Sequence, residues 1–433
     1  MWRFTGGDYS LVTPAGETRG SWLFSSKKGR LLLLSVFLVF FLFVGAWMHP
    51  DTAAAISRLT GDDGSSAPTA GKSPDEDQDE EKDKNKPQEG GHPDHEAQLG
   101  SGEVERPEYF PAAHMKEEKE KFAYLTWLSS TPETDNEDFS SNEYFIACRV
   151  LIWQLLHDPK TKAAENFDVV VLAGPKVSEA HRERLRQDGA IVRVVEVPHT
   201  ENDGWIVPEE SRWGDVMGKL RAWEMVEYSR ILMLDGDMLL QSPLDPIFND
   251  PNATVMLTKS DRGHKDDEPD LPDDYLLCSF MEISRASHDW PPSDRSRFPG
   301  YFNAGFFMLK PSKKMFDYYM GLLDMPGRFS PEYPEQNLLN YAHRWEGAMP
   351  WREISGRWNT KFTSEDDLRG GVVSMHEKFW KLRSGGTELM RFVDSKRWQA
   401  EGYWLAQKEA NAEAAAKAKA EAAEKPVKGS IRR

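Results

Sequence analysis

The sequence predicts an α/β protein whose core is a parallel β-sheet built from β-α-β units. Between residues 121 and 235, short apolar segments alternate with segments of helical period, and this alternation is typical of parallel sheets. One apolar segment, FDVVVLAG at residues 167–174, is a continuous β-branched run, as expected of a strand covered on both faces. The chain of 433 residues can hold such a domain together with additional segments.

The individual elements are predicted from local patterns in chain order. Apolar residues recur at helical spacing in residues 141–157, which predicts a helix with a buried face. Residues 178–190 indicate a polar helix that begins after the N-cap Ser178 and ends near a glycine. Strands are predicted at residues 121–128, 167–174, 190–197 and 230–235.

Residues 212–229 predict an amphipathic α-helix directly before the last of these strands. Lys219 lies off the apolar stripe of this helix, so its side chain could reach a ligand. The stripe, at steps of three and four residues, consists of Trp213, Val216, Leu220, Trp223 and Val226.

Composition excludes some classes of protein. A formal net charge of -17 argues against nucleic-acid binding, because no basic surface would contact phosphates. Two cysteines, Cys148 and Cys278, are too few for a disulfide framework, and the sequence does not decide whether they pair. Asn252 begins an N-x-T sequon, which is a glycan acceptor only if this part of the chain is lumenal.

The N-terminal part of the chain predicts a membrane anchor. Residues 31–48 are uncharged and apolar, and a bilayer span needs roughly 20 such residues. Lysine and arginine precede this segment, so the positive-inside rule assigns residues 1–30 to the cytosol. A cleaved signal peptide is the alternative, but the apolar run is longer than the usual one of roughly 7–15 residues.

The remaining chain divides by composition into three parts. Residues 49–117 are acidic and of low complexity, which predicts a disordered stem. Residues 118–403 form the predicted globular domain. Residues 404–433 are rich in alanine, glutamate and lysine and indicate an exposed helical tail without an apolar face.

Two acids follow the predicted strand at residues 230–235. Asp235 and Asp237 flank Gly236, at the strand end where ligands of parallel sheets bind. Side chains two residues apart on an extended segment point the same way, so the carboxylates would converge and repel. A divalent cation such as Mn²⁺ or Mg²⁺ would neutralise them. The alternative is a solvated turn, because Asp-Gly is a common turn dipeptide.

Five segments of the globular domain follow one another in the order KLRAWEMVEYSRILMLDGDMLLQSPLDPIF, YFNAGFFMLKPS, PEQNLLNYAHRW, WNTKF and HEKFW. In this order they resemble the family 8 glycosyltransferases, the glycogenin-like group. The resemblance extends over residues 122–382, and the anchored form is most similar to fungal Golgi type II N-acetylglucosaminyltransferases. It implies a GT-A (Rossmann-like) fold, a UDP-sugar donor, Mn²⁺ or Mg²⁺, and retention of configuration.

The resemblance also implies roles for individual residues. Asp235 and Asp237 match the metal-binding D-x-D motif, and His376 matches the third metal ligand; alone, His376 would be an ordinary histidine. Thr126 and Tyr144 match the positions that hold the uracil ring, although Tyr144 alone would fit a helix-face core.

Further positions match the donor site of the family. Lys219 matches a lysine that faces the donor phosphates, and its alternative is a solvated lysine. Asn303 matches a donor-sugar contact, although an asparagine in an apolar strand could simply bond backbone groups. Gly236 is a further candidate substrate-binding residue, because a glycine lets a ligand approach the backbone closely.

Two departures from the family pattern are visible. In EYPEQN, Glu332 and Glu335 replace aspartates, while Gln336 is retained. Glu335 and Gln336 are therefore candidate catalytic residues near the sugar, together with Lys378, and Glu332 is a candidate substrate-binding residue. In HEKFWKL the glycine and proline of the family motif are missing, and either Lys378 or Lys381 could contact the pyrophosphate. Lys378 is favoured because it keeps the K-x-W order.

The sequence thus predicts a Golgi single-pass type II membrane glycosyltransferase with a lumenal catalytic domain. Its expected partners are a UDP-sugar, a glycan or glycoprotein acceptor, and the membrane. The favoured sugar is N-acetylglucosamine, followed by glucose or galactose. Two other classes stay open: an inactive lumenal protein that binds nucleotide sugars or glycans, and a metal-dependent nucleotide-sugar phosphohydrolase.

Overall fold

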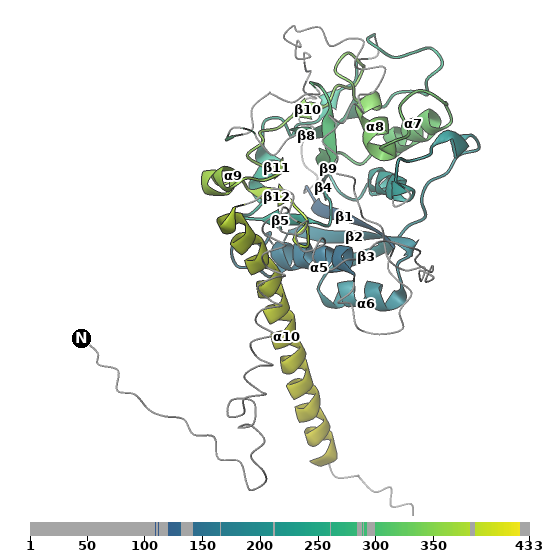
Figure 1. Ribbon diagram of the computed structural model, residues 1–433. Helices are drawn as coiled ribbons and strands as arrows, with labels where there is room; N and C mark the ends of the chain where they lie inside the picture. Colours follow the sequence, from purple (N-terminus) through teal and green to yellow (C-terminus); the bar gives the residue numbers. More distant parts are fainter. Residues whose placement is uncertain are drawn as a thin grey trace, which may run out of the picture. The chain divides into compact units, whose positions relative to one another are not determined.

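Figure 1 shows the computed structural model of the chain. It describes residues 109, 111, 120–130, 142–164, 166–210, 213–259, 261–283, 288, 290–291, 299–381 and 386–424. The predicted cytosolic tail and anchor, residues 1–48, lie outside these residues, as does the predicted stem apart from Tyr109 and Pro111. In the described part of the chain, no helix is both long enough and apolar enough to cross a bilayer.

A seven-stranded mixed sheet in the order β10-β8-β9-β4-β1-β2-β3 forms the centre of the described structure. β1 to β4 are mutually parallel, as predicted, whereas β9 runs antiparallel to both of its neighbours. The sheet is therefore mixed rather than purely parallel. The strands are β1 (Phe122–Ser130), β2 (Phe167–Lys176), β3 (Ile191–Val194), β4 (Arg230–Leu234), β8 (Leu277–Met281), β9 (Phe302–Leu309) and β10 (Arg352–Glu353).

Helices cover both faces of this sheet because side chains alternate along each strand. In β1, Tyr124 and Leu128 pack on the α5 and α6 side, while Leu125 and Trp127 pack on the opposite side. Both predicted helices of the first side are confirmed: α5 (Glu143–Leu156) and α6 (Glu179–Gln187), with Ser178 as its N-cap. The opposite side carries η3 (Val216–Glu224), α7 (Lys313–Leu323) and α8 (Pro334–Ala342).

The predicted amphipathic α-helix at residues 212–229 is wrong in its type and length. The structure has a 3₁₀ helix, η3, in which Met217, Leu220 and Trp223 are buried at steps of three, as its three-residue turn requires. Val226, assigned to the buried stripe, is exposed. A Cβ at Gly218 would lie 2.2 Å from the Trp127 ring, so η3 rests directly on β1 there.

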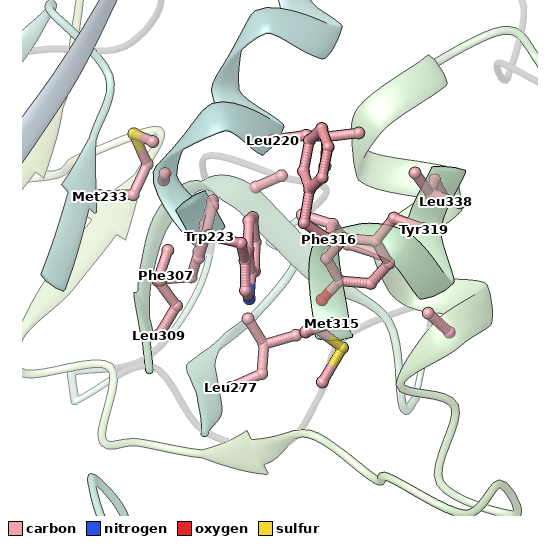
Figure 2. Packing of buried hydrophobic residues seen from close by; sticks show 14 of the residues in the cluster. Leu220, Trp223, Met233, Leu277, Phe307, Leu309, Met315, Phe316, Tyr319 and Leu338 are labelled. Carbon is pink, nitrogen blue, oxygen red and sulfur yellow. The ribbon is translucent and has the colours of Figure 1, made fainter. Parts of the chain in front are cut away.

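Trp223 is the centre of the core on the η3 side (Figure 2). Its ring stacks on Phe307 of β9 at a centroid distance of 5.8 Å and meets the edge of Tyr319 of α7 at 4.9 Å. Replacing such a buried tryptophan by alanine typically costs about 3–5 kcal/mol. This contact fixes η3, and with it Lys219, against the sheet.

A second sheet has three short strands in the order β11-β12-β5: β11 (Asn359–Lys361), β12 (Ser374–His376) and β5 (Met238–Leu240). β5 follows β4 after a turn, and Gln154 of α5 holds it. The Gln154 Nε2 donates to the Met238 carbonyl at 3.2 Å, and the Leu240 N–H donates to the Gln154 Oε1 at 2.7 Å. The buried amide therefore fixes the strand that follows the two acids.

The long helix α10 (Thr387–Glu424) packs on α5 and the three-stranded sheet. Lys396 and Asp158 form a buried ion pair at 2.7 Å, and the Arg149 guanidinium lies 3.7 Å from the Trp404 ring centroid. The helix passes through residue 404, where the sequence analysis places the start of the tail, and Trp404 itself is buried. Side chains at 405–421 are exposed.

Shorter elements connect these layers. They are η1 (Asp203–Trp205), η4 (Asp245–Asn249), β6 (Met256–Leu257), β7 (Asp274–Tyr275) and α9 (Glu365–Gly370). Tyr109 and Pro111 of the predicted stem contact the domain: the Tyr109 hydroxyl donates to the Trp351 carbonyl at 3.0 Å, and Pro111 bridges to Met256.

Two questions that the sequence left open concern the cysteines and the sequon. Cys148 and Cys278 are separate, buried free thiols. The Asn252 Nδ2 donates to the Glu353 carbonyl at 2.8 Å, and Arg352 donates to its Oδ1 at 2.6 Å. The amide of the sequon is thus part of the packing beside β10.

Candidate active site

The two acids after β4 lie in a tight turn. The Asp235 N–H donates to the Gly305 carbonyl at 2.7 Å, and the Met238 N–H donates back to the Asp235 carbonyl at 3.3 Å. The chain therefore turns between β4 and β5 instead of continuing as an extended strand. The alternative of a turn is correct in this respect, but Asp237 in this turn is buried, at 8% exposed, rather than solvated.

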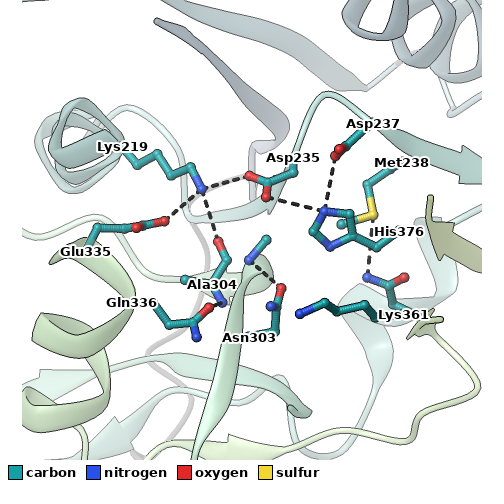
Figure 3. A network of polar contacts seen from close by, with 12 residues as sticks. Lys219, Asp235, Asp237, Met238, Asn303, Ala304, Glu335, Gln336, Lys361 and His376 are labelled. Carbon is teal, nitrogen blue, oxygen red and sulfur yellow. Dashed lines mark hydrogen bonds and ion pairs between the residues drawn. The ribbon is translucent and has the colours of Figure 1, made fainter. Parts of the chain in front are cut away.

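His376 meets the two carboxylates because β12 pairs with β5. The antiparallel register places His376 opposite Met238, and the Glu377 N–H donates to the Asp237 carbonyl at 3.2 Å. The His376 Nε2 lies 3.1 Å from the Asp237 Oδ1 and 3.6 Å from the Asp235 Oδ2 (Figure 3). The three predicted metal ligands thus converge.

Gly305 of β9, to which the sequence assigned no role, makes room for this cluster. A Cβ there would lie 2.6 Å from the His376 Cε1 and 2.7 Å from the Asp235 Oδ2. A Cβ at Gly236 would lie 3.6 Å from Cys148, which is an ordinary van der Waals distance. Of the two glycines, Gly305 is therefore the one whose surroundings leave no space for a side chain. The available signal was a glycine inside a buried apolar strand.

Charge and burial oppose each other in this cluster. Burial raises the pKa of Asp237, but the adjacent His376 outweighs burial and lowers this pKa to about 2. Burial lowers the pKa of His376, while Asp237 and Asp235 outweigh it and raise the pKa above its usual value. The carboxylates thus favour a positive charge at the place where they meet.

The three side chains fit a divalent cation. Each offers one ligand atom, and these atoms lie within 4.8 Å of one another. Neighbouring ligands on an ion with bonds of about 2.1 Å stand about 3 Å apart, close to the separation of the His376 Nε2 and the Asp237 Oδ1. Carboxylate oxygens are the ligands that hard divalent cations prefer.

Lys219 is buried and ion-paired rather than solvated. Its Nζ lies 2.7 Å from the Asp235 Oδ1 and 2.8 Å from the Glu335 Oε1, and it donates to the Ala304 carbonyl at 3.4 Å (Figure 3). Burial lowers the pKa of this lysine, but Asp235 and Glu335 outweigh burial and raise it. Lys219 therefore stays charged between a candidate metal ligand and the acid of α8.

The motif EYPEQN, which leads into α8, contains both buried and exposed residues. Glu335 is buried, and burial raises the pKa of its carboxyl although Lys219 acts against this. Gln336 accepts the Ala304 N–H at 3.0 Å and donates to the Tyr301 hydroxyl at 2.9 Å, so its amide joins α8 to β9. Glu332 is exposed, and its carbonyl accepts the Glu209 N–H at 3.1 Å.

Asn303 is held by Glu282, which is held in turn by Lys361; neither acid nor lysine received a role from the sequence. Its Nδ2 donates to the Glu282 Oε2 at 2.6 Å, and its Oδ1 accepts the Gly305 N–H at 2.9 Å. The other Glu282 oxygen accepts from the Lys361 Nζ at 2.9 Å. Glu282 directly follows the apolar strand β8, just as Asp235 follows β4, and that pattern could have identified it.

Tyr144, Lys378 and Trp380 form an aromatic and cationic group at the start of α5. Tyr144 is 43% exposed, which excludes the alternative that it belongs to the core. The Lys378 Nζ lies 5.2 Å from the Tyr144 ring centroid, and the Trp380 ring meets Tyr144 at 5.0 Å. Lys378 also contributes to the lowered pKa of Asp237, so its charge reaches the turn.

Thr126 and Lys381 are the remaining residues singled out by the sequence. Thr126 is buried in the middle of β1, paired with Val171 of β2, and its hydroxyl has no hydrogen-bond partner among the described residues. Lys381 is exposed, and its N–H donates to the Lys378 carbonyl at 2.9 Å. Of the two candidate lysines, Lys378 is therefore the one whose charge acts on the turn that holds Asp235 and Asp237.

Comparison with protein families identifies the class to which this fold and site belong. The sequence model of glycosyl transferase family 8 matches residues 139–377, more than half of the chain. The chain belongs to this family and is a glycosyltransferase. The mixed α/β sheet is accordingly a GT-A-like fold.

Two relatives illustrate how similar the chain is to other proteins. An uncharacterized protein of Schizosaccharomyces pombe is 31% identical over 306 residues, which cover 63% of this chain and 77% of that protein. Galactinol synthase 10 of Arabidopsis thaliana is 25% identical over 256 residues, which cover 52% of this chain and 71% of that protein.

Solved structures resemble the chain weakly. The galactosyltransferase LgtC, in complex with donor and acceptor sugar analogs, gives a TM-score of 0.38 at 17% identity, covering 63% of this chain and 95% of that one. Mouse xyloside xylosyltransferase 1 gives 0.38 at 14% identity, covering 59% and 97%. Similarity at this level carries no inference about substrate.

Proposed function

We propose that this chain is a metal-dependent, retaining glycosyltransferase that moves a sugar from a UDP-sugar to a glycan or glycoprotein acceptor. The observation that carries the proposal is the convergence of Asp235, Asp237 and His376 at the end of β4, with Lys219 2.7 Å from Asp235. N-acetylglucosamine is the first candidate sugar, because of the resemblance to fungal Golgi N-acetylglucosaminyltransferases; glucose and galactose follow.

The reaction requires stabilisation of a leaving diphosphate. The bond between the anomeric carbon and the β-phosphate oxygen breaks, and its electron pair leaves with UDP. The acceptor oxygen bonds to the same face of the anomeric carbon, and its proton passes to the leaving phosphate oxygen. A cation on Asp235, Asp237 and His376 would supply Lewis-acid neutralisation of the diphosphate.

The chain's own residues supply the rest of the electrostatic stabilisation. Lys219 holds a buried positive charge beside Asp235, where negative charge develops on the leaving group. Glu335, fixed by Lys219, places a carboxylate that can stabilise positive character on the sugar. Covalent attack by Glu335 is the less favoured route, and isolation of a stable glycosyl adduct on Glu335 would establish it.

Transfer assays with the purified full chain test this function. A panel of UDP-sugars with Mn²⁺ and glycan acceptors should give transfer from one sugar, lost when a chelator removes the metal. Asp237→Ala removes a buried candidate ligand, so transfer should fall at least a hundredfold and Mn²⁺ affinity should fall with it. Asp317→Ala changes an exposed acid on α7 and serves as the control.

Other outcomes of the same assay would overturn the proposal. Donor binding without transfer or hydrolysis would indicate an inactive binding protein. Release of sugar or sugar phosphate without an acceptor would indicate a phosphohydrolase. Full transfer by Asp237→Ala would contradict the metal site, and an inverted product would contradict retention.

The proposed location is the Golgi membrane, with the catalytic domain in the lumen. This part of the proposal rests on the apolar segment 31–48 and the basic residues before it. Protease protection of a C-terminal tag in intact Golgi vesicles is the expected result. Cleavage of the tag without detergent would place the domain on the other side of the membrane.

A further inference from the structure

Lys361 stands beside the candidate metal ligands, although neither the family comparison nor the sequence assigns it a role. It ends β11, which runs parallel to β12, and the register places Lys361 next to His376. Side chains at paired positions of neighbouring strands lie on the same face of a sheet. Figure 3 shows Lys361 on the His376 side of the cluster, with its ammonium end directed toward Asn303.

Glu282 holds Lys361 in this direction. The Lys361 Nζ donates to the Glu282 Oε1 at 2.9 Å, and the other oxygen of Glu282 accepts from Asn303. Asn303 in turn accepts the N–H of Gly305, the glycine that packs against His376. The lysine is therefore joined by hydrogen bonds to the strand that supports the metal cluster.

The backbone after Lys361 is held in a conformation that non-glycine residues rarely adopt. Phe362 has φ of 57°, in the left-handed region, which costs free energy for a residue with a Cβ. The Thr363 N–H donates to the buried Glu377 Oε1 at 2.6 Å, and Glu377 follows His376. The protein thus maintains local strain where it ties Lys361 to the His376 strand.

Lys361 also differs from Lys219 in how much of its charge remains accessible. The Lys219 side chain is 7% exposed and contacts two carboxylates, whereas the Lys361 side chain is 26% exposed and its ammonium contacts Glu282. An ammonium carries three donors, so the contact with Glu282 leaves capacity for an anionic oxygen. Lys361 is placed to meet an anion that approaches the metal cluster from the His376 side.

We propose that Lys361 binds the diphosphate of the nucleotide-sugar donor and that Glu282 is its positioning residue. This inference rests on the proposed function, because it requires a donor with a diphosphate. A cation on each side of the metal cluster, Lys219 at Asp235 and Lys361 at His376, would then oppose the charge of the leaving group.

Binding of UDP and uridine to the full chain tests the inference. Lys361→Met keeps the apolar stem and removes the charge. It should weaken binding of UDP in the presence of Mn²⁺ at least tenfold by calorimetry, while uridine binding, followed by ligand-observed NMR, stays unchanged. Lys310→Met is the matched control, since Lys310 also pairs with an acid, Asp274, and lies at the opposite end of β9.

A double variant separates diphosphate binding from a purely structural ion pair. If Lys361 only neutralises Glu282, then Lys361→Met with Glu282→Gln should recover wild-type UDP affinity; we expect the double variant to stay weak. Lys361→Arg keeps the charge and should stay within a few fold of wild type, which remains informative if Lys361→Met fails to fold. Unchanged UDP affinity in a folded Lys361→Met protein, or recovery in the double variant, overturns the inference.

The same measurements distinguish this failure from failure of the proposed function. A wild-type chain that binds UDP with Mn²⁺ and transfers sugar, but whose Lys361→Met variant binds UDP equally well, refutes only the role of Lys361. A wild-type chain that neither binds UDP nor transfers sugar refutes the proposed function and the inference together.

Discussion

Gly305 shows how one missing side chain shapes the site. Its Cα faces His376, Asp235 and Asn303 at distances that leave no space for a methyl group. The neighbours are a ring carbon and two oxygens, which are themselves held by hydrogen bonds or ion pairs. A side chain here must therefore displace at least one candidate metal ligand.

Gly305→Ala should separate the ligands while the sheet stays intact. Displacements near 1 Å can cost about a hundredfold in rate, so we expect a loss of that size in transfer and a parallel loss of Mn²⁺ affinity by calorimetry. Gly204→Ala is the control, because a Cβ there has nothing within 4 Å. Wild-type Mn²⁺ affinity in Gly305→Ala would show that the ligands do not converge as described.

At the scale of elements, α10 is part of the catalytic unit rather than an appendage. Leu389, Val393 and Trp404 are buried in the core that contains Met375 of β12, and each buried side chain of this kind contributes about 1.5–3 kcal/mol. Loss of α10 would also leave Asp158 without Lys396, and an uncompensated buried charge costs about 3–5 kcal/mol.

Two truncations of α10 should therefore behave differently. A chain that ends at Leu405 keeps all the buried side chains of α10 that the structure describes, and it should retain the melting temperature and transfer activity. A chain that ends at Gly386 loses contacts comparable to the typical total stability of about 5–15 kcal/mol and should not fold. Circular dichroism and transfer assays check both, and a folded, active shorter chain would contradict this assignment.

At the scale of the whole molecule, a buried histidine links stability to pH. The His343 Nδ1 lies 2.8 Å from the Met349 carbonyl, to which it must donate, so the Nε2 accepts from the Tyr319 hydroxyl at 2.7 Å. Burial lowers the pKa of His343 to about 4. Below about pH 6.5 the unfolded chain binds a proton that the folded chain does not, so stability falls as pH falls toward 4.

Unfolding free energies in urea at pH 7 and pH 4.5 measure this effect. The loss between the two pH values should be smaller in His343→Gln than in wild type by about 2–3 kcal/mol, two pKa units of linkage. His199→Gln, which replaces a histidine whose side chain is 75% exposed, is the control for the substitution itself. An equal pH dependence in wild type and His343→Gln would mean that His343 titrates normally in the fold.

The sequence predicted the features that depend on local pattern. The alternating segments identified β1 to β4, α5 and α6, and the two acids at a strand end identified the place of the candidate site, although the turn there was only the alternative to an extended segment. Local pattern could not place antiparallel β9 between β4 and β8, because strand order is set by tertiary packing. The 3₁₀ form of η3 was not predicted, because a three-residue turn buries much the same apolar stripe as an α-helix over so short a segment.

Some residues of the candidate site could be predicted from the sequence, and others required the structure. Motifs identified Asp237, His376 and Lys219, although the ion pairs of Lys219 with two acids required the structure. Lys361 belongs to the segment WNTKF that carries the resemblance, but its place beside His376 was not predicted, because it follows from the pairing of two three-residue strands. Such short strands leave almost no periodicity in a sequence.

The pairing of β5 with β12 also bears on the order of folding. Asp237 leads into β5 and His376 ends β12, so the ligand set is complete only when these two strands, far apart in the chain, have paired. Contacts of large sequence separation form slowly, because the entropy of loop closure is lost before the contact is gained. A cation bound there would stabilise only chains in which the two strands have paired, so Mn²⁺ binding during refolding would report when this pairing occurs.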